Sequence, residues 1–217
     1  MNKAVIFDMD GVLVDNNPWH IKAWMTFCKR HSVHMTVEEI TSHFGNTNDD
    51  YLNFLFRHKL SLTEINVYGG EKEEIYREIY RGQIVPLNGL LDILDLLDEE
   101  GYLIGLATSA PAKNVDFTLD GLGIKKRFNV IVDATSIKKG KPDPEIYLLA
   151  SKRLGVMPSR CIVFEDSVHG IQAAVSAGMH AIGVLTTQTK ENLAKAHHLI
   201  NDFSEISAEF LNRILHD

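Results

Sequence analysis

The chain is poor in cysteine. Its two cysteines, Cys28 and Cys161, lie far apart in the sequence, without the close spacing that is typical of a zinc or iron–sulfur site. A disulfide between them stays open at this stage. Two buried free thiols in a reducing compartment are the expected state, because a chain of 217 residues can build a core without such a link.

Positive charge and long apolar runs are also scarce. The sequence has 22 Lys and Arg against 29 Asp and Glu, a formal net charge of −7, which leaves no basic face for a nucleic-acid backbone. No apolar stretch approaches the ~20 residues that span a bilayer. The N-terminus has neither the charged region nor the small-residue cleavage site of a secretory signal. We therefore expect a cytoplasmic protein that has no nucleic-acid or membrane partner.

Short apolar segments recur along the chain, and helical patterns separate them. Leucines at helical spacing between residues 87 and 97, and the stretches 144–154 and 171–177, predict helices. Strands that alternate with helices indicate parallel βαβ units. The predicted fold class is α/β, with a doubly wound, Rossmann-like parallel sheet. Its expected strands cover residues 4–7, 102–107, 129–132, 161–164 and 181–185.

The region between the first two expected strands has a different pattern. It holds no convincing strand, and Gly45–Asn48 and Gly69–Gly70 are expected to interrupt its helices. We therefore expect an all-helical cap domain at residues 15–82. The α/β core then comprises residues 1–14 and 83–217. A domain inserted beside the expected active crevice is well placed to act as a lid. The helices expected in it cover residues 19–30, 37–43, 49–59 and 71–81.

Polar clusters follow four of the expected strands. Because the carboxyl ends of parallel strands meet at one edge of a sheet, these clusters can converge there. Together they supply acids for a cation, hydroxyl and backbone donors, and a lysine, which is what a phosphoryl group requires. The clusters are Asp8 with Asp10, Thr108 with Ser109, the loop 138–144 with Lys141, and Glu165 with Asp166.

Each cluster also has a purely structural interpretation. Asp10-Gly11 suits an ordinary turn, and Thr108-Ser109 could cap the next helix. The lysines of residues 138–141 could form a solvated loop, and Glu165-Asp166 suits the start of a helix. Taken singly, these interpretations are as good as the functional one, whereas four polar strand ends in this order favour a shared site.

The four clusters, read with their neighbours, resemble the four motifs of the haloacid dehalogenase superfamily. The closest subgroup is the β-phosphoglucomutase-like phosphatases, which carry a helical cap after the first strand. The resemblance extends to residues 170–178 and spans nearly the whole chain. The matching stretches are residues 8–15, 107–109, 140–145 and 164–170.

The resemblance implies a role for each acid and for Lys141. Asp8 is similar to the nucleophile that becomes an aspartyl phosphate, and Asp10 to the general acid/base. Mg²⁺ is the implied cofactor, with Asp8, Asp166 and the Asp10 main-chain carbonyl as ligands and Glu165 as a direct or water-mediated neighbour. Lys141 would neutralise Asp8.

Thr108, the Ser109 backbone and Lys141 resemble the clamp that holds the phosphate. Superfamily members that remove halogens work without a metal and lack the second acid. Asp10 and the Glu165-Asp166 pair therefore argue against that chemistry.

Residues of the expected cap distinguish a phosphatase from a mutase, which moves a phosphoryl group within a sugar phosphate. The chain resembles β-phosphoglucomutases at His20 and Trp24, but those enzymes carry a lysine and an arginine where this chain has Phe44 and Asn48. Losing two charge-assisted contacts, at ~1.5–3 kcal/mol each, should weaken a bisphosphate intermediate. The neutral loop residues expected to contact substrate are Gly45, Asn46, Thr47 and Asn48.

We therefore expect a phosphatase that acts on a small phosphate ester, such as a sugar or polyol phosphate. A mutase stays open, since Arg57, Lys59 or Lys72 could supply a displaced clamp. So does an inactive ligand-binding member of the fold. His20 could be a packed core histidine or could orient Asp10 when the lid closes. A monomer or a weak homo-oligomer is expected, and the individual ester is not readable from the sequence.

Overall fold

The computed structural model describes residues 2–41 and 48–215, and it divides the chain into two compact units. One unit comprises Met1–Asp15 with Val85–Asp217, and the other is Asn16–Ile84. The predicted boundaries, at residues 15 and 82, lie within two residues of this division. That the second unit acts as a cap over the site stays a prediction.

The first unit is built on a six-stranded sheet in which every neighbouring pair is parallel. The strand order is β3-β2-β1-β4-β5-β6, so β1 is central and the chain winds outward in both directions. This confirms the predicted doubly wound α/β fold. The strands are β1 (Ala4–Phe7), β2 (Leu103–Ala107), β3 (Val130–Val132), β4 (Cys161–Glu165), β5 (His180–Val184) and β6 (His198–Ile200).

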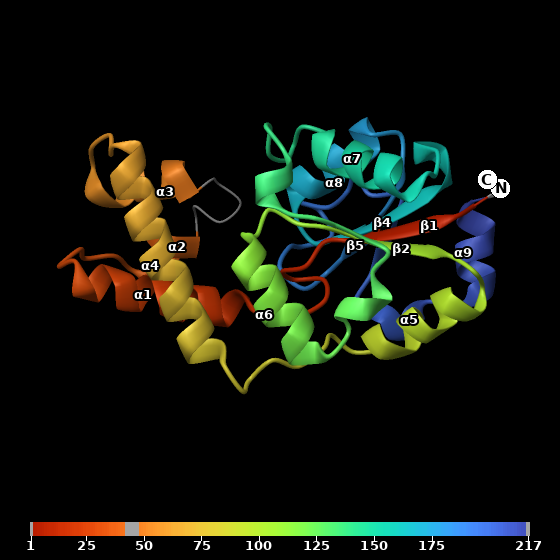
Figure 1. Cartoon of the computed structure of the whole chain (residues 1–217), viewed down its shortest axis with the longest axis horizontal. Helices are drawn as coiled ribbons and strands as arrows, with labels where there is room; N and C mark the ends of the chain where they lie inside the picture. Colours follow the sequence, from red (N-terminus) through yellow and green to blue (C-terminus); the bar gives the residue numbers. More distant parts are fainter. Residues whose placement is uncertain (1, 42–47, 216–217) are drawn as a thin grey trace. The chain divides into compact units, whose positions relative to one another are not determined.

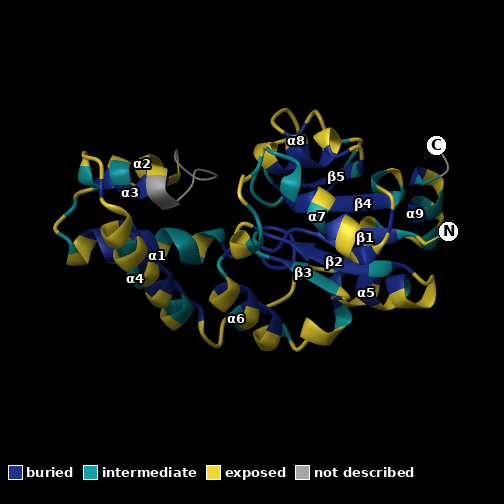
Figure 2. Ribbon diagram, turned by 45° about the horizontal axis from the view of Figure 1, so that its top comes forward, coloured by how far each residue is buried: buried dark blue, intermediate teal, exposed yellow. Residues whose placement is uncertain are grey.

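Helices cover both faces of this sheet, with α7 and α8 on one side and α5 and α9 on the other (Figure 1). Alternation along β1 shows why: Val5 and Phe7 join one apolar cluster, whereas Ala4 and Ile6 join the other. The central strands are buried along their length (Figure 2). The helices of this unit are α5 (Leu90–Glu99), α6 (Ala112–Leu122), α7 (Glu145–Leu154), α8 (Val168–Ser176) and α9 (Ala208–Ile214).

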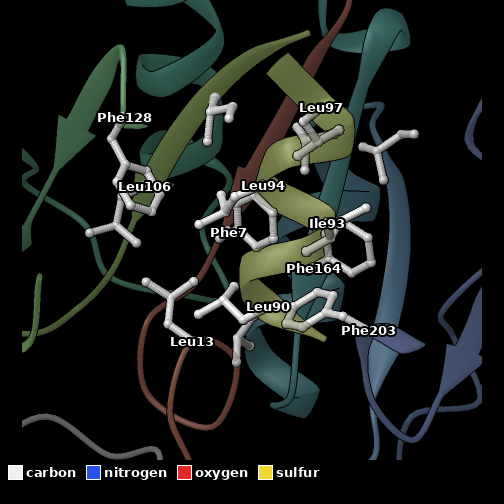
Figure 3. Close-up of a cluster of buried hydrophobic side chains, with 14 of the residues drawn as sticks. Phe7, Leu13, Leu90, Ile93, Leu94, Leu97, Leu106, Phe128, Phe164 and Phe203 are labelled. Carbon is white, nitrogen blue, oxygen red and sulfur yellow. The ribbon is translucent and has the colours of Figure 1, made fainter. Parts of the chain in front are cut away.

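Three phenylalanine rings form the centre of the cluster under α5 (Figure 3). Phe7 stacks on Phe164 with centroids 5.2 Å apart, and Phe203 meets both rings edge-on at 5.7 and 5.1 Å. The leucines Leu90, Leu94 and Leu97 of α5 pack in the same cluster. This packing fixes β1 and β4, the two strands that lead into the acidic motifs.

The second unit is helical, as predicted. Its longest helix begins with a capping box in which Ser61 and Glu64 satisfy each other's backbone N–H groups. The prediction that Gly69-Gly70 interrupts the helical structure is wrong. Both glycines lie inside this helix, where tertiary packing overrides their low helix propensity. The helices are α1 (Asn17–Arg30), α2 (Val37–Thr41), α3 (Asn48–Phe56) and α4 (Leu62–Tyr80).

The predictions for the two cysteines and for the helix-terminating glycines are confirmed. Cys28 and Cys161 are both buried and free, so the structure has no disulfide between them. Gly101, Gly155 and Gly178 follow helices with positive φ values of 70°, 68° and 73°, as helix-terminating glycines do. The sequence pattern gave no bounds for α6, and it missed α9 and the three-residue edge strand β6. No helix among the described residues has the length and apolar character needed to cross a membrane.

Replacing Leu94 by alanine should lower the free energy of unfolding by about 2–5 kcal/mol, because the fully buried side chain leaves a cavity beside Phe7. Leu91 is the matched control: it lies on the same helix, is 46% exposed, and should lose less than ~1 kcal/mol as alanine. Urea unfolding followed by amide circular dichroism measures both variants. Tryptophan fluorescence would not report on this unit, because both tryptophans lie in the other one. Equal losses in the two variants would contradict this packing.

Candidate active site

The acidic motifs meet at the carboxyl ends of the central strands. Asp8 follows β1, and its backbone N–H donates to the Phe164 carbonyl on β4 at 3.0 Å. Glu165 ends β4, and Asp166 comes next. One oxygen from each of these three carboxylates lies within 4.8 Å of the others, and all three residues are buried.

Lys141 reaches this cluster from the loop before α7. Its Nζ donates to Asp8 Oδ1 at 2.8 Å and to Glu165 Oε1 at 2.5 Å, and its side chain is only 9% exposed. Lys138 and Lys139 are exposed, so the solvated-loop interpretation holds for those two lysines and not for Lys141. The loop is held in place where the backbone N–H groups of Lys138 and Lys139 donate to Glu145.

Burial and like charge raise the pKa values of these acids, whereas Lys141 and hydrogen-bond donors lower them. Burial raises the pKa of Asp8 to about 7, with Lys141 opposing the rise and Glu165 and Asp10 adding to it. Burial, Glu165 and Asp8 together raise the pKa of Asp166 well above its usual value. Burial disfavours the charge on Glu165 too, but Lys141 and the Ser167 N–H hold its pKa below the ordinary value.

The donor set fits a divalent cation such as Mg²⁺. With all three carboxylates ionised, the one ammonium would leave two negative charges in a buried site, which a divalent cation would neutralise. All three acids offer oxygen ligands, which Mg²⁺ prefers. A cation there would favour the ionised form of Asp8 and Asp166. The side chain of Asp10 is half-buried and is not one of these three ligands; the prediction that its main-chain carbonyl binds the metal stays a prediction.

Two glycines make room for the carboxylates. A Cβ on Gly11 would lie 2.1 Å from Asp166 Oδ2, and a Cβ on Gly170 would lie 1.7 Å from Glu165 Oε1. Gly11 also has a φ of 74°, which disfavours any residue with a side chain. Both positions therefore require glycine because a carboxylate occupies the space.

The second strand end contributes Thr108 and Ser109. Thr108 is buried, its N–H donates to the Val132 carbonyl at 3.0 Å, and its Oγ1 accepts from the Ala110 N–H at 3.1 Å. Ser109 is exposed. Helix α6 starts after Pro111 without a side-chain cap, so the capping interpretation of Thr108-Ser109 is wrong. Their role as a phosphate clamp stays a prediction.

Two site residues were missed by sequence reasoning. The Tyr147 hydroxyl on α7 donates to Glu165 Oε1 at 3.1 Å, and its ring lies 5.2 Å from Lys141 Nζ. The Thr187 hydroxyl donates to Asp166 Oδ2 at 2.5 Å. The sequence did contain a signal for Thr187: the polar pair Thr186-Thr187 follows the fifth expected strand, just as the other polar clusters follow theirs.

His20 belongs to the helical unit Asn16–Ile84. His20 is half-buried, stacks on Tyr76 with ring centroids 4.0 Å apart, and its Nδ1 lies 2.9 Å from Lys72 Nζ. Burial and the Lys72 ammonium lower the pKa of His20 to about 3, so the ring is neutral and Nδ1 accepts. His20 is thus packed against Tyr76 and Lys72 of its own unit. Whether it orients Asp10 stays a prediction.

The predicted cap-loop contacts fall mostly outside the described residues. Gly45, Asn46 and Thr47 are not described, and Asn48 begins α3. Their contact with substrate stays a prediction.

The family comparison decides the class of protein. A model of the haloacid dehalogenase-like hydrolases matches residues 5–184. The chain belongs to this family. The resemblance predicted from its motifs is thereby confirmed.

Relatives with named activities act on phosphate groups. The chain is 30% identical to validoxylamine A 7'-phosphate phosphatase of Streptomyces hygroscopicus subsp. limoneus, over 95% of this chain and 96% of that one. It is 34% identical to β-phosphoglucomutase of Bacillus subtilis (strain 168), over 97% and 94%. These relatives support phosphate ester hydrolysis or phosphoryl transfer, and they bear out the predicted enzyme class, a phosphoric monoester hydrolase.

The fold is also shared with solved structures. A hydrolase of this family, family IA variant 3, from Entamoeba histolytica superposes with a TM-score of 0.93 at 31% identity, and the match covers 99% of this chain and 100% of that one.

Replacing Gly170 by alanine should lower the free energy of unfolding by about 1–3 kcal/mol, because the new methyl group overlaps the buried Glu165 carboxylate. That carboxylate cannot swing away without leaving Lys141 and Ser167. Gly70 is the control: its Cβ would meet nothing within 4 Å inside α4, so alanine there should stabilise by ~0.5–1 kcal/mol. Urea unfolding measures both; a fully stable Gly170→Ala variant would show that Glu165 is not held in this position.

Proposed function

We propose that the protein is a magnesium-dependent phosphatase that hydrolyses a small phosphate ester through an aspartyl-phosphate intermediate. The observation that carries this proposal is the buried Asp8 carboxylate, which Lys141 contacts at 2.8 Å and which lies within a three-carboxylate cluster. A sugar or polyol phosphate is the proposed substrate class.

Asp8 is the proposed nucleophile. One carboxylate oxygen attacks the phosphorus atom, the ester oxygen leaves, and the phosphoryl group is bonded to Asp8. Lys141 holds the Asp8 carboxylate in place and offsets its charge, which matters because burial alone favours the protonated, unreactive form.

Asp10 is the proposed acid/base. It donates a proton to the leaving ester oxygen, and as a carboxylate it then takes a proton from the water that attacks the aspartyl phosphate. Water addition releases inorganic phosphate and restores Asp8. The electrostatic influence of Asp10 on the pKa of Asp8 supports this placement.

Thr108 and the Ser109 backbone are the proposed donors to the phosphoryl oxygens, together with Lys141. Asp8, Asp166 and the Asp10 carbonyl would hold Mg²⁺, with Glu165 beside it. A bound Mg²⁺ supplies positive charge to the phosphoryl oxygens as charge develops on them.

Phosphoryl transfer to a second position of the same sugar is the alternative, and the similarity to β-phosphoglucomutase favours it. A mutase must retain a bisphosphate. Lys72 is poorly suited to be the displaced clamp, because its ammonium is 2.9 Å from Glu73 Oε1 and both side chains are less than 10% exposed. Arg57 and Lys59 are exposed and stay open for that role. The neutral loop residues Phe44 and Asn48 favour hydrolysis.

Replacing Asp8 by asparagine should reduce phosphate release at least ~1000-fold with little change in fold, because the amide keeps the shape but cannot act as the nucleophile. Asp116 gives the matched control: its carboxylate makes an exposed ion pair with Lys125, so its asparagine variant should keep full activity. Phosphate release and circular dichroism measure both. Substantial activity in Asp8→Asn would overturn the nucleophile assignment, and no release by the wild type would favour an inactive, ligand-binding protein.

The wild type with Mg²⁺, β-glucose 1-phosphate and a glucose bisphosphate primer should release phosphate without accumulating glucose 6-phosphate. Glucose 6-phosphate formed without matching phosphate release would establish a mutase. A panel of hexose phosphates, polyol phosphates, phosphoglycolate and pyrophosphate, assayed by phosphate release, identifies the preferred ester.

A further inference from the structure

The loop that follows β5 reaches the metal-binding acids. Thr187 Oγ1 lies 2.5 Å from Asp166 Oδ2 and 3.1 Å from the Asp166 carbonyl oxygen. The preceding residue, Thr186, donates its hydroxyl to the Gly11 carbonyl at 2.5 Å. Two consecutive threonines thus connect this loop to the motifs that end β4 and β1.

The hydroxyl of Thr187 determines which way the Asp166 carboxylate faces. An aspartate side chain rotates about two bonds, so a single ligand oxygen has no fixed position unless the other oxygen is held. Thr187 holds Oδ2, and Gly11 leaves just enough space behind it, since a Cβ on Gly11 would lie 2.1 Å from that oxygen. Since this contact engages Oδ2, Oδ1 is the oxygen that we expect Asp166 to offer to a cation.

The same hydrogen bond stabilises the ionised form of the Asp166 carboxyl group. An ionised carboxylate accepts hydrogen bonds only, and a hydroxyl donating to it makes a short, charge-assisted bond. Asp166 is 7% exposed, so water supplies little of this solvation. Partners that orient metal ligands in this way typically contribute 10–100-fold to metal affinity.

We propose that Thr187 is a positioning residue for the divalent cation, acting through Asp166. This inference rests on the proposed magnesium site. Replacing Thr187 by valine keeps the shape of the side chain and removes the donor. Serine at the same position keeps the donor and removes only the methyl group.

The experiment measures Mg²⁺ binding by isothermal titration calorimetry on the full-length protein. Thr187→Val should raise the Kd about 10–100-fold, and Thr187→Ser should stay within about 3-fold of the wild type. At saturating Mg²⁺ the kcat of Thr187→Val should approach that of the wild type, because only the half-saturating Mg²⁺ concentration depends on how Asp166 is oriented.

Two controls isolate the hydroxyl. Thr118→Val removes a fully buried hydroxyl on α6 that has no hydrogen-bond partner among the described residues, and Mg²⁺ affinity should not change. Thr186→Val removes the contact to Gly11 but not the one to Asp166, and its Kd should change less than about 3-fold. If Thr186→Val weakens Mg²⁺ binding as strongly as Thr187→Val, the position of the loop and not the Thr187 hydroxyl controls the site, and the inference is wrong.

The remaining outcomes are also decisive. Thr187→Val that unfolds at lower urea yet binds Mg²⁺ as the wild type does would show a merely structural role and overturn the inference. Wild-type protein that fails to bind Mg²⁺ would instead overturn the proposed magnesium site itself.

Discussion

The buried contact of Lys141 with Asp8 and Glu165 is the interaction on which the rest of the site depends. Three carboxylates in a buried space repel one another, and one ammonium offsets only part of that charge. The remaining negative charge makes the site suitable for a divalent cation. Burial and the neighbouring carboxylates together raise the pKa of Asp8 and Asp166, whereas the contacts of Glu165 with Lys141 and Ser167 hold its pKa below the ordinary value. The charge imbalance therefore favours the binding of a divalent cation.

Both the sheet topology and side-chain contacts keep these charged groups together. Parallel strands around β1 bring their carboxyl ends to one edge, and the aromatic cluster beneath α5 fixes the two strands that end in acids. Gly11 and Gly170 lie where any side chain would displace a carboxylate. Tyr147 and Thr187 then hold single oxygens of Glu165 and Asp166. The acids are in this way oriented by partners that come from several separate segments.

Much of this could be predicted from the sequence, because an apolar run that ends in polar residues marks both a strand and its functional end. That pattern located Asp8, Lys141, Glu165 and Asp166, which the structure brings together, whereas the role of Thr108 stays a prediction. Thr187 and Tyr147 could not be assigned roles, since a hydroxyl between distant segments depends on tertiary structure. The unbroken α4 was missed although its capping box at Ser61 is visible, because the glycines inside it favour a break. Strand β6 was missed because only two of its three residues, Leu199 and Ile200, are apolar, whereas the equally short β3 is the continuous apolar run Val-Ile-Val.

The most direct test of the account is to identify the residue that carries the phosphoryl group. Borohydride, added while the wild-type protein turns over its preferred ester with Mg²⁺, reduces an acyl phosphate to homoserine, which peptide mass spectrometry can locate. The account predicts homoserine at position 8, and only when both ester and Mg²⁺ are present. Modification of a different acid, or none at position 8 during active turnover, would contradict it.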